Sequence, residues 1–343
     1  MTAAPPIVSP AQPASLEYPF TAPPTDGPLV EVAPGVLWAR IGMPMALSHI
    51  NVWLLRGDDG WTIVDTGLST DETRALWEHI IAERLDGAPV RALVCTHFHY
   101  DHAGLASWMT ERFGVPLYMS LGEFLMMRML GSQTRSVPQP EEQHFYARAG
   151  MPQDRVERVF EALRQDPFVP PRQDQFRRLR AGDVLTIGPR RWQVLIGEGH
   201  SPEHVCLYSA EDRLLIGGDQ LLPRITSNVM VTAFEPEGNP LALWFESLDR
   251  LETCAEGTLV LPSHQNVFRG VHARVGQLRE HHQQQRWPST TFSPATTCSR
   301  SARRWRTWPG CANGACSSAG SRRTASFAIT SYSPPSMRTC TGE

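Results

Sequence analysis

Short apolar runs that end near Gly, Asp or His divide the chain into candidate strands, and residues with helical spacing lie between them. In the first half, strands are predicted over residues 31–41, 51–57, 61–67, 90–95 and 115–120, where Val, Ile, Leu and Trp are concentrated. Helices are predicted over about 69–86, where Ser69 and Glu72 fit a capping box, and over 105–114. The first half therefore alternates strand and helix.

The second half repeats this order after a helical insertion. The insertion covers about residues 121–179 and is long enough to fold over a site, with helical patterns over 122–133, 141–151 and 152–165. Beyond it, strands are predicted over 183–188, 190–200, 204–220 and 258–264, and helices over 240–252 and 272–285. Two similar halves predict two sheets packed together with helices on their outer faces.

The two ends of the chain differ from this ordered body. Residues 1–29 are rich in Pro, Ala and Ser without periodicity, which predicts a mobile N-terminal arm that can pack on the surface. Residues 287–343 contain no Leu, Val or Asp but 11 Ser and 9 Thr, a composition typical of disorder. Because the change is abrupt and falls in mid-helix, out-of-frame translation is favoured over a natural low-complexity tail. The chemistry is therefore expected within residues 30–286.

Composition narrows the classes of function. The sequence has no Lys, which excludes Schiff-base and P-loop chemistry. Its 7 Cys form no CxxC pair, so neither a disulfide framework nor a zinc site made only of cysteines is indicated. Ahead of residue 287 there are 25 Arg against 34 acidic residues, and such an acidic body binds nucleic acid poorly. Without a secretory start or a membrane-length apolar run, a cytoplasmic protein with no membrane partner is expected. The oligomeric state stays open.

The stretch THFHYDHAG, residues 96–104, places three histidines and an aspartate directly after the predicted strand VRALVC. His97 and His99 are two residues apart, so their rings can point to the same side as the strand ends and hold one ion. Asp101 and His102 follow in the turn and face a neighbouring position. A surface histidine cluster is the alternative, but this spacing arises by chance in roughly one chain in a thousand or fewer. The motif therefore predicts a metal centre.

Three further candidate ligands end predicted strands in the second half, namely His200 in GEGHSPEH, Asp219 in GGDQ and His264 in LPSHQ. Each would be weak evidence alone, because a histidine at a strand end is more often a hydrogen-bonded structural residue. Together with the first motif, they can converge on one sheet edge, where loops carry function. His204 lies four residues after His200 and is a candidate donor of a hydrogen bond to the residues of the site.

The motif HFHYDH after a strand, followed in order by GEGHSPEH, GGDQ and LPSHQ and preceded by VDTG, resembles the metallo-β-lactamase superfamily over about residues 31–285. The resemblance implies an α/β fold, a four-layer αββα sandwich, with two divalent metal ions at one edge between the sheets. Zinc is the expected metal, with iron or manganese as alternatives. The implied ligands are His97, His99 and His200 for the first metal, Asp101, His102 and His264 for the second, Asp219 between the two, and Asp65 as an orienting residue behind the ligands. The last motif of the family is usually PGHG, so PSHQ changes the backbone freedom around His264.

Hydrolysis is the chemistry that such a centre favours. A bound metal lowers the pKa of water from 15.7 to about 7, which supplies hydroxide at neutral pH. Asp101 is the expected catalytic residue, because its carboxylate can accept or orient the proton of that water. The spacing HSPEH is similar to the hydroxyacylglutathione hydrolase (glyoxalase II) branch, which implies cleavage of an ester, thioester or lactone. β-Lactamase, phosphodiesterase or nuclease activity, an iron-dependent persulfide dioxygenase and a non-catalytic binding module stay open, because one fold serves many functions.

A small acyl compound is the expected substrate, and the insertion offers candidate contacts for it. Phe124 and Met127, together with Phe145 and Tyr146, can line an apolar mouth, and Arg148 can meet a carboxylate. For a helix rich in Met, core packing is an equally good interpretation. A surface arginine is more often simply solvated.

Overall fold

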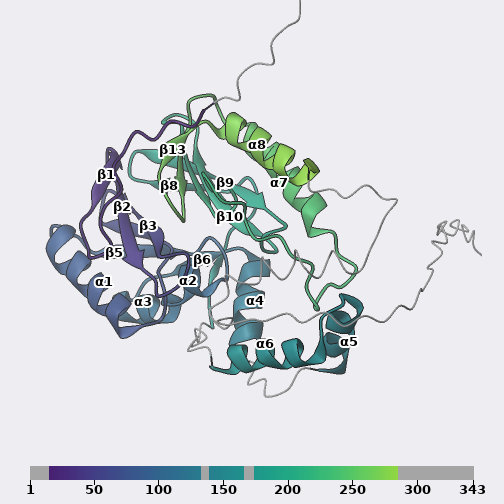
Figure 1. Ribbon diagram of the computed structural model, residues 1–343. Helices are drawn as coiled ribbons and strands as arrows, with labels where there is room; N and C mark the ends of the chain where they lie inside the picture. The colour runs from purple at the N-terminus through teal and green to yellow at the C-terminus, as the bar shows by residue number, and fades with distance from the viewer. Residues whose placement is uncertain (1–14, 133–138, 166–173, 285–343) are drawn as a thin grey trace, which may run out of the picture.

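Two sheets packed face to face, with helices on the outer face of each, form the protein (Figure 1). The computed structural model describes residues 15–132, 139–165 and 174–284. The first sheet has the order β1-β2-β3-β4-β5-β6-β7, with strands β1 (Val30–Ala33), β2 (Val36–Gly42), β3 (His49–Arg56), β4 (Trp61–Val64), β5 (Val90–Val94), β6 (Leu117–Met119) and β7 (Arg177–Arg178). The second has the order β13-β12-β11-β10-β9-β8, with strands β8 (Val184–Ile187), β9 (Arg190–Gly197), β10 (His204–Ser209), β11 (Leu214–Gly218), β12 (Leu259–Pro262) and β13 (Phe268–Arg269). The expected αββα sandwich is confirmed.

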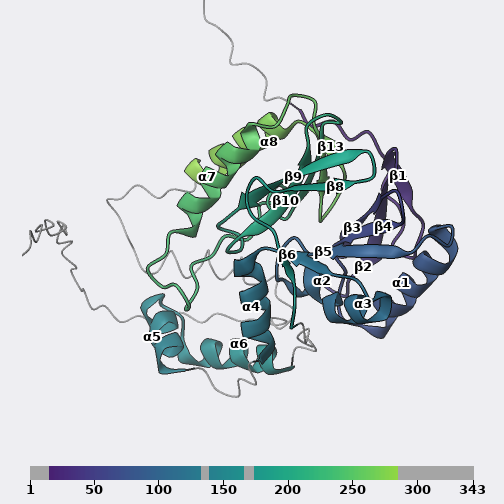
Figure 2. The same ribbon diagram turned by 180° about the vertical axis from the view of Figure 1, so that it is seen from behind.

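Helices close both outer faces (Figures 1 and 2). The first sheet is covered by α1 (Asp71–Arg84) and α3 (Ala106–Phe113), and the second by α7 (Pro240–Glu252) and α8 (Val271–Gln284). A short helix, α2 (Tyr100–Ala103), lies directly after β5. Among the described residues, no helix has both the length and the apolar character that a membrane crossing requires.

The central strands send alternate side chains into different layers of the core. In β3, Ile50 packs under the helices of the first sheet, whereas Trp53 lies between the two sheets. In β10, Leu207 lies between the sheets and Cys206 packs under α7 and α8. Both sides of these strands are buried, because side chains alternate with a period of two and each sheet is covered on both faces. The strands therefore read as continuous apolar runs in the sequence.

The segment 31–41, predicted as one strand, is a hairpin instead. Its two arms, β1 and β2, pair antiparallel. Gly35 in the turn has a φ of 70°, a conformation that glycine adopts without strain. The carbonyl of Gly35 also accepts a hydrogen bond from Arg56 N at 2.8 Å, which ties the turn to the end of β3.

The start of α1 lies one residue later than predicted. Thr70 is the N-cap, and its side-chain oxygen accepts a hydrogen bond from Thr73 N at 3.1 Å. The predicted capping box of Ser69 and Glu72 is wrong, because the Ser69 hydroxyl accepts a hydrogen bond from the Arg74 side chain at 3.0 Å and does not cap the helix. Thr70 performs the capping with the same chemistry.

The insertion is helical, as its pattern predicts. Its helices are α4 (Leu121–Ser132), α5 (Pro140–Arg148) and α6 (Gln153–Gln165). They lie together at one end of the sandwich (Figure 1). The chain enters α4 straight from β6, and α4 therefore starts next to the strand ends of the first sheet. This position makes the insertion a neighbour of any site at that edge.

Residues 15–29, the described part of the expected N-terminal arm, pack on the sandwich. Glu17 and Arg269 pair through their backbones, with N···O distances of 3.3 and 2.8 Å. Leu16 and Tyr18 contact the core under α7 and α8, and Phe20 contacts the layer between the sheets. This part of the arm is thus held by apolar burial and backbone pairing. Residues 1–14 and the whole of 287–343 lie outside the described residues.

The last helix carries two adjacent histidines, and the sequence predicts no functional role for either. His281 is exposed, whereas His282 is buried and its ring lies 4.9 Å from that of Trp244. We expect His281→Ala to change the free energy of unfolding by no more than about 0.5 kcal/mol and His282→Ala to cost about 1–3 kcal/mol, because only the second removes a packed side chain. Urea denaturation of both variants measures this. Equal costs would contradict the packing described.

Candidate metal centre

The candidate ligands lie at one edge of the sandwich because of how the strands are directed. β4 runs parallel to β5 in the first sheet, and β11 runs parallel to β12 in the second. Parallel strands end at the same edge, so Asp65 and His97 emerge side by side, as do Asp219 and His264. β9 has the direction of β11, since both are antiparallel to β10 between them. His200, which follows β9, therefore joins the same edge.

Three imidazoles form a first cluster, defined as His97, His99 and His200. Nε2 of His97 lies 2.7 Å from Nδ1 of His99 and 3.2 Å from Nε2 of His200. Nitrogens on a tetrahedral zinc, each about 2.0–2.1 Å from the ion, are roughly 3.3 Å apart. The separation of 3.2 Å matches that spacing and the one of 2.7 Å is shorter, so the three nitrogens could hold one ion after a small shift of the His97 and His99 rings.

A second cluster consists of Asp101, His102 and His264. The Asp101 Oδ2 atom lies 3.5 Å from Nε2 of each histidine. Asp219 stands between the clusters, with Oδ1 3.2 Å from His264 Nε2 and Oδ2 3.4 Å from His200 Nε2. One carboxylate with an oxygen toward each cluster is the arrangement expected of a bridging ligand.

The histidine rings are oriented by acceptors behind them. His102 Nδ1 lies 2.9 Å from Asp65 Oδ2, and His264 Nδ1 lies 2.9 Å from the carbonyl of His49. His200 Nδ1 lies 2.9 Å from the carbonyl of Asn228. These oxygens only accept, so we assign a proton to each Nδ1, which leaves Nε2 directed at the cluster, where it binds a metal ion in its deprotonated form. Such outer partners fix the ring in the form that binds a metal.

Asp65 organises the end of the first sheet. Its Oδ1 accepts a hydrogen bond from Thr96 N at 2.8 Å and its Oδ2 accepts one from Thr96 Oγ1 at 2.9 Å, in addition to the contact with His102. The backbone of Asp65 has a φ of 65°, which is uncommon for a residue other than glycine. Asp65 therefore connects the ends of β4 and β5, and it lies where the sequence expects an orienting residue.

His204 lies behind the clusters and is fully buried. Its Nε2 accepts a hydrogen bond from the backbone N of Asp219 at 3.1 Å, and its ring stacks 4.8 Å from that of His97. The prediction that His204 donates a hydrogen bond to the site is wrong in direction, because its Nε2 accepts one, and this contact fixes the backbone of Asp219. Burial lowers the pKa of His204 to about 3, so it stays neutral.

The two clusters differ in electrostatic character. Burial lowers the pKa of every histidine in the first cluster below its ordinary value, which favours the neutral imidazole that binds metals. Burial also opposes a charge on His102, but Asp101, Asp65 and Asp219 outweigh it and raise its pKa to about 10. The carboxylates around the second cluster thus attract positive charge, whether a proton or a metal ion.

Unpartnered polar atoms at the centre agree with a cation site. His102 Nε2, His264 Nε2 and Asp219 Oδ1 are buried and make no well-formed hydrogen bond among the described residues, although His264 Nε2 and Asp219 Oδ1 lie 3.2 Å apart. Leaving buried polar atoms unpaired costs free energy, which a cation bound between them would offset. The donor set of imidazoles and carboxylates is one that zinc, iron and manganese accept. The residues present therefore fit divalent metal ions.

Gln265 replaces the usual glycine of the last motif and adopts the backbone that glycine would. Its φ is 67°. The backbone N of Gln265 donates to His49 Nε2 at 3.0 Å, and its carbonyl accepts from Arg40 Nη2 at 2.7 Å and from Asn51 Nδ2 at 3.0 Å. Three contacts hold this conformation, so His264 keeps its place despite the changed residue.

Two of the five residues expected to contact substrate belong to the core. Phe124 is buried and stacks on Phe176, with ring centroids 3.9 Å apart, and Met127 is fully buried in the core of the first sheet. The prediction that they line a mouth is wrong, because this face of α4 packs inward. Phe145 and Arg148 do line a pocket, and Tyr146 lies beside Phe145 at 5.3 Å between ring centroids.

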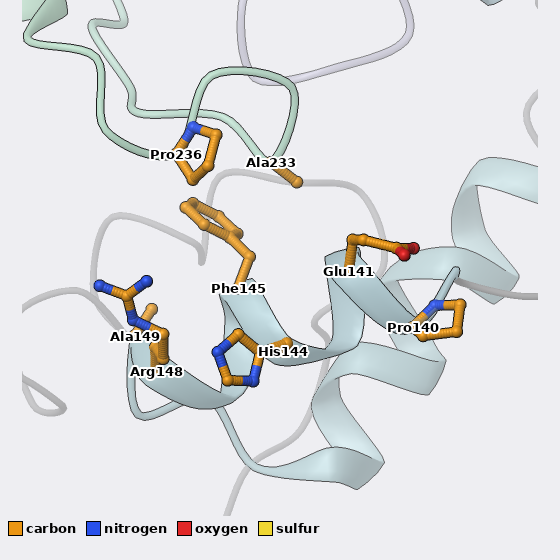
Figure 3. A pocket seen from close by; sticks show the side chains of 8 residues that line it. All are labelled: Pro140, Glu141, His144, Phe145, Arg148, Ala149, Ala233 and Pro236. Carbon is orange, nitrogen blue, oxygen red and sulfur yellow. The ribbon is translucent and has the colours of Figure 1, made fainter.

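That pocket has a volume of about 580 Å³ and lies between α5 and the segment 229–239 (Figure 3). Phe145 points from α5 toward Ala233 and Pro236 on the opposite wall. Arg148 at the rim lies 3.4 Å from Glu237, and both side chains are exposed. Apolar side chains such as Phe145, Ala233 and Pro236 form the facing walls of the pocket, and the charged Arg148 lies at its edge.

Glu123 and Thr96 contribute to the site although neither belongs to a ligand motif of the sequence. Glu123, at the start of α4, is fully buried and contacts the turns that carry the first cluster. Burial raises its pKa to about 7 against the hydrogen bonds that lower it. A lone carboxylate in the apolar run GEFLMM was the available signal for Glu123. For Thr96, the available signal was its position directly before His97.

Comparisons with known proteins agree with this geometry. A family model described as the metallo-beta-lactamase superfamily matches residues 46–264. The crystal structure of a beta-lactamase domain protein from Burkholderia ambifaria is 46% identical, with a TM-score of 0.72 and 78% of each chain covered. The probable metallo-hydrolase YqjP of Bacillus subtilis (strain 168) is 26% identical over 70% of this chain and 74% of its own length. The acyl-coenzyme A thioesterase MBLAC2 of Gallus gallus is 26% identical over 68% of this chain and 79% of its own.

The matched range includes both clusters and Asp219, and it spans more than half of the chain. The relatives named as metallo-hydrolase and thioesterase support a hydrolase. This chain belongs to the metallo-β-lactamase superfamily.

Proposed function

We propose that this protein is a binuclear metal-dependent hydrolase that cleaves the acyl bond of a thioester. The observation that carries the proposal is the convergence of two ligand clusters on one bridging carboxylate, Asp219, at the edge of the sandwich. Two divalent ions, with zinc favoured, would be held there by the three residues of each cluster and by Asp219. Esters and lactones have the same acyl chemistry and are the next candidates.

When bound, the metal ions would supply an activated water at neutral pH and polarise the carbonyl of the substrate. The chain's own contribution begins with Asp101, whose carboxylate lies against His102 and His264 and retains some solvent exposure. In this position it can take the proton of the attacking water and return it to the leaving group. Asp65, behind His102, keeps that ring in place while the proton moves.

One observation supports a thioester, and a second supports a substrate with an acyl chain. The thioesterase MBLAC2 is similar to this chain over most of its own length. The segment that follows β11 provides Asp219 and the carbonyl that orients His200, and farther along it forms a wall of the apolar pocket. A substrate whose carbonyl lies at the clusters could therefore extend its acyl chain along this segment toward α5. The acidic body again argues against a nucleic acid as substrate.

Phe145→Ala is expected to discriminate between long and short acyl chains. Phe145 crosses the pocket toward Ala233 and Pro236, so its loss removes apolar contact from a long chain only (Figure 3). We expect KM for a long-chain acyl thioester to rise roughly 10-fold, which corresponds to about 1.4 kcal/mol, with an acetyl thioester unaffected. Steady-state kinetics with both substrates test this. A similar rise for both would place the acyl chain elsewhere.

A substrate panel tests the proposed function itself. Purified protein is assayed with acyl thioesters, esters, lactones, a β-lactam and a phosphodiester under the same conditions. We expect thioesters to give the highest kcat/KM and the phosphodiester to give none. Turnover of the β-lactam alone, or of the phosphodiester alone, would overturn the assignment of substrate. Turnover of none, by a folded protein loaded with metal, would favour a binding module.

A further inference from the structure

A buried carboxylate outside the clusters contacts both turns that carry the first cluster. Glu123 Oε2 accepts a hydrogen bond from the backbone N of Phe98 at 3.0 Å. Its Oε1 accepts one from Ser201 Oγ at 2.6 Å and one from the backbone N of Glu203 at 2.7 Å. The side chain is fully buried. A single group at the start of α4 therefore holds two segments that are about a hundred residues apart in the sequence.

The contacts fall next to the ligands themselves. Phe98 lies between His97 and His99, and Ser201 follows His200 directly. The separation of the two turns determines the distance between His200 Nε2 and His97 Nε2, which is 3.2 Å. Glu123 is thus placed to set the spacing of all three donors without touching any of them.

A reciprocal contact fixes α4 against the second turn. Glu203 Oε2 accepts a hydrogen bond from Gly122 N at 2.7 Å, and the Glu203 carbonyl accepts one from Ser120 Oγ at 2.7 Å. A Cβ atom added at Gly122 would lie 3.1 Å from Glu203 Cγ, so the helix and the turn are closely packed. Glu123 therefore has little freedom to move away from the turns.

The chemistry of the side chain matters as much as its place. A carboxylate can accept hydrogen bonds from all three donors, whereas an amide oxygen can accept two and its NH₂ group can accept none. Burying a carboxylate is costly unless donors surround it, and the three donors here offset part of that cost. A glutamine at this position could still anchor α4 to one turn. It would leave the other turn without a hydrogen-bond acceptor.

We propose that Glu123 is a positioning residue that sets the geometry of the first cluster and thereby its affinity for a metal ion. This proposal rests on the metal-binding role proposed for the first cluster. It also means that the helical insertion, besides carrying the apolar pocket, takes part in forming the metal centre.

Glu123→Gln tests the role with little change in volume. The oxygen of the new amide can still accept the hydrogen bonds from Ser201 Oγ and Glu203 N. Its NH₂ group would face Phe98 N, and because both groups are donors, no hydrogen bond can form there. Zinc is removed from the full-length protein, and the zinc dissociation constants are measured by competition with a chromophoric chelator. We expect the affinity of the first site to fall about 10- to 100-fold, the range typical of partners behind metal ligands.

Glu142→Gln is the matched control, because Glu142 is also a buried glutamate of the insertion and its Oε2 accepts a hydrogen bond from Gln139 N at 2.9 Å. Its zinc affinity should equal that of the wild type. If Glu123→Gln lowers the melting temperature of the metal-free protein but binds zinc like the wild type, Glu123 is only an anchor of α4 and the proposal is wrong. Should Glu123→Gln fail to fold, Ser201→Ala tests the same contact from the other turn, and unchanged zinc affinity there would equally overturn it. A wild type that binds no zinc would instead refute the proposed function.

Discussion

Replacing His97 with alanine is expected to remove metal from the first cluster and to abolish turnover. His97 Nε2 lies within reach of both other members, at 2.7 Å from His99 Nδ1 and 3.2 Å from His200 Nε2. Without it, two histidines and Asp219 remain, and a site short of a ligand holds zinc far more weakly. We expect the zinc affinity of this site to fall by more than about 100-fold, beyond the loss typical of outer partners. Metal analysis after gel filtration and thioester assays measure both effects.

The control for this variant is His79→Ala. His79 lies on α1 and is partly exposed, and its Nδ1 lies 3.5 Å from the surface glutamate Glu83. Its replacement should leave both metal content and rate at wild-type values. A His97→Ala protein with the metal content and rate of the wild type would refute the ligand assignment, whatever the sequence motif suggests.

Asp101→Ala should separate metal binding from proton transfer. The change removes a carboxylate from the second cluster and leaves the three imidazoles of the first. About one metal ion per chain should remain, and turnover should fall by roughly two to four orders of magnitude, the contribution typical of a general base. Metal quantification and the rate of thioester hydrolysis on one preparation give both values.

Asp101→Asn refines the comparison. Asparagine keeps an oxygen that can contact a metal ion but cannot take a proton at neutral pH. If Asp101 handles the proton, the asparagine variant should retain more metal than the alanine variant yet be similarly slow. Wild-type turnover in either variant would remove Asp101 from the mechanism.

The pattern of apolar residues predicts the layers of this fold because the central strands are buried on both sides. Continuous runs such as that of β3 leave little doubt about a strand, and their breaks at Gly and Asp mark the turns. Strands β7 (Arg177–Arg178) and β13 (Phe268–Arg269) are missed, since two residues are too few to show the alternation of a strand. Within each sheet the strands are neighbours in chain order, but local patterns do not show which neighbours run parallel, as β4 and β5 do.

The candidate ligands are predictable because each is a chemically distinctive residue at the end of a strand. Their orienting partners are different, since His49 and Asn228 act through backbone carbonyls, which any residue type provides. Phe124 and Met127 are misplaced because a Met-rich helix has the same composition in a core as at a binding surface. The role of Glu123 cannot be predicted from local sequence, because its hydrogen-bond partners come from two distant turns.

The metal content of the purified wild type tests the central claim most directly. The protein is stripped with a chelator, loaded with zinc, passed through gel filtration and analysed for bound zinc per chain. The arrangement of the two clusters about Asp219 predicts two zinc ions per folded chain, and thioester hydrolysis that is lost on stripping and restored on loading. A folded protein that retains no zinc after this treatment would contradict the account.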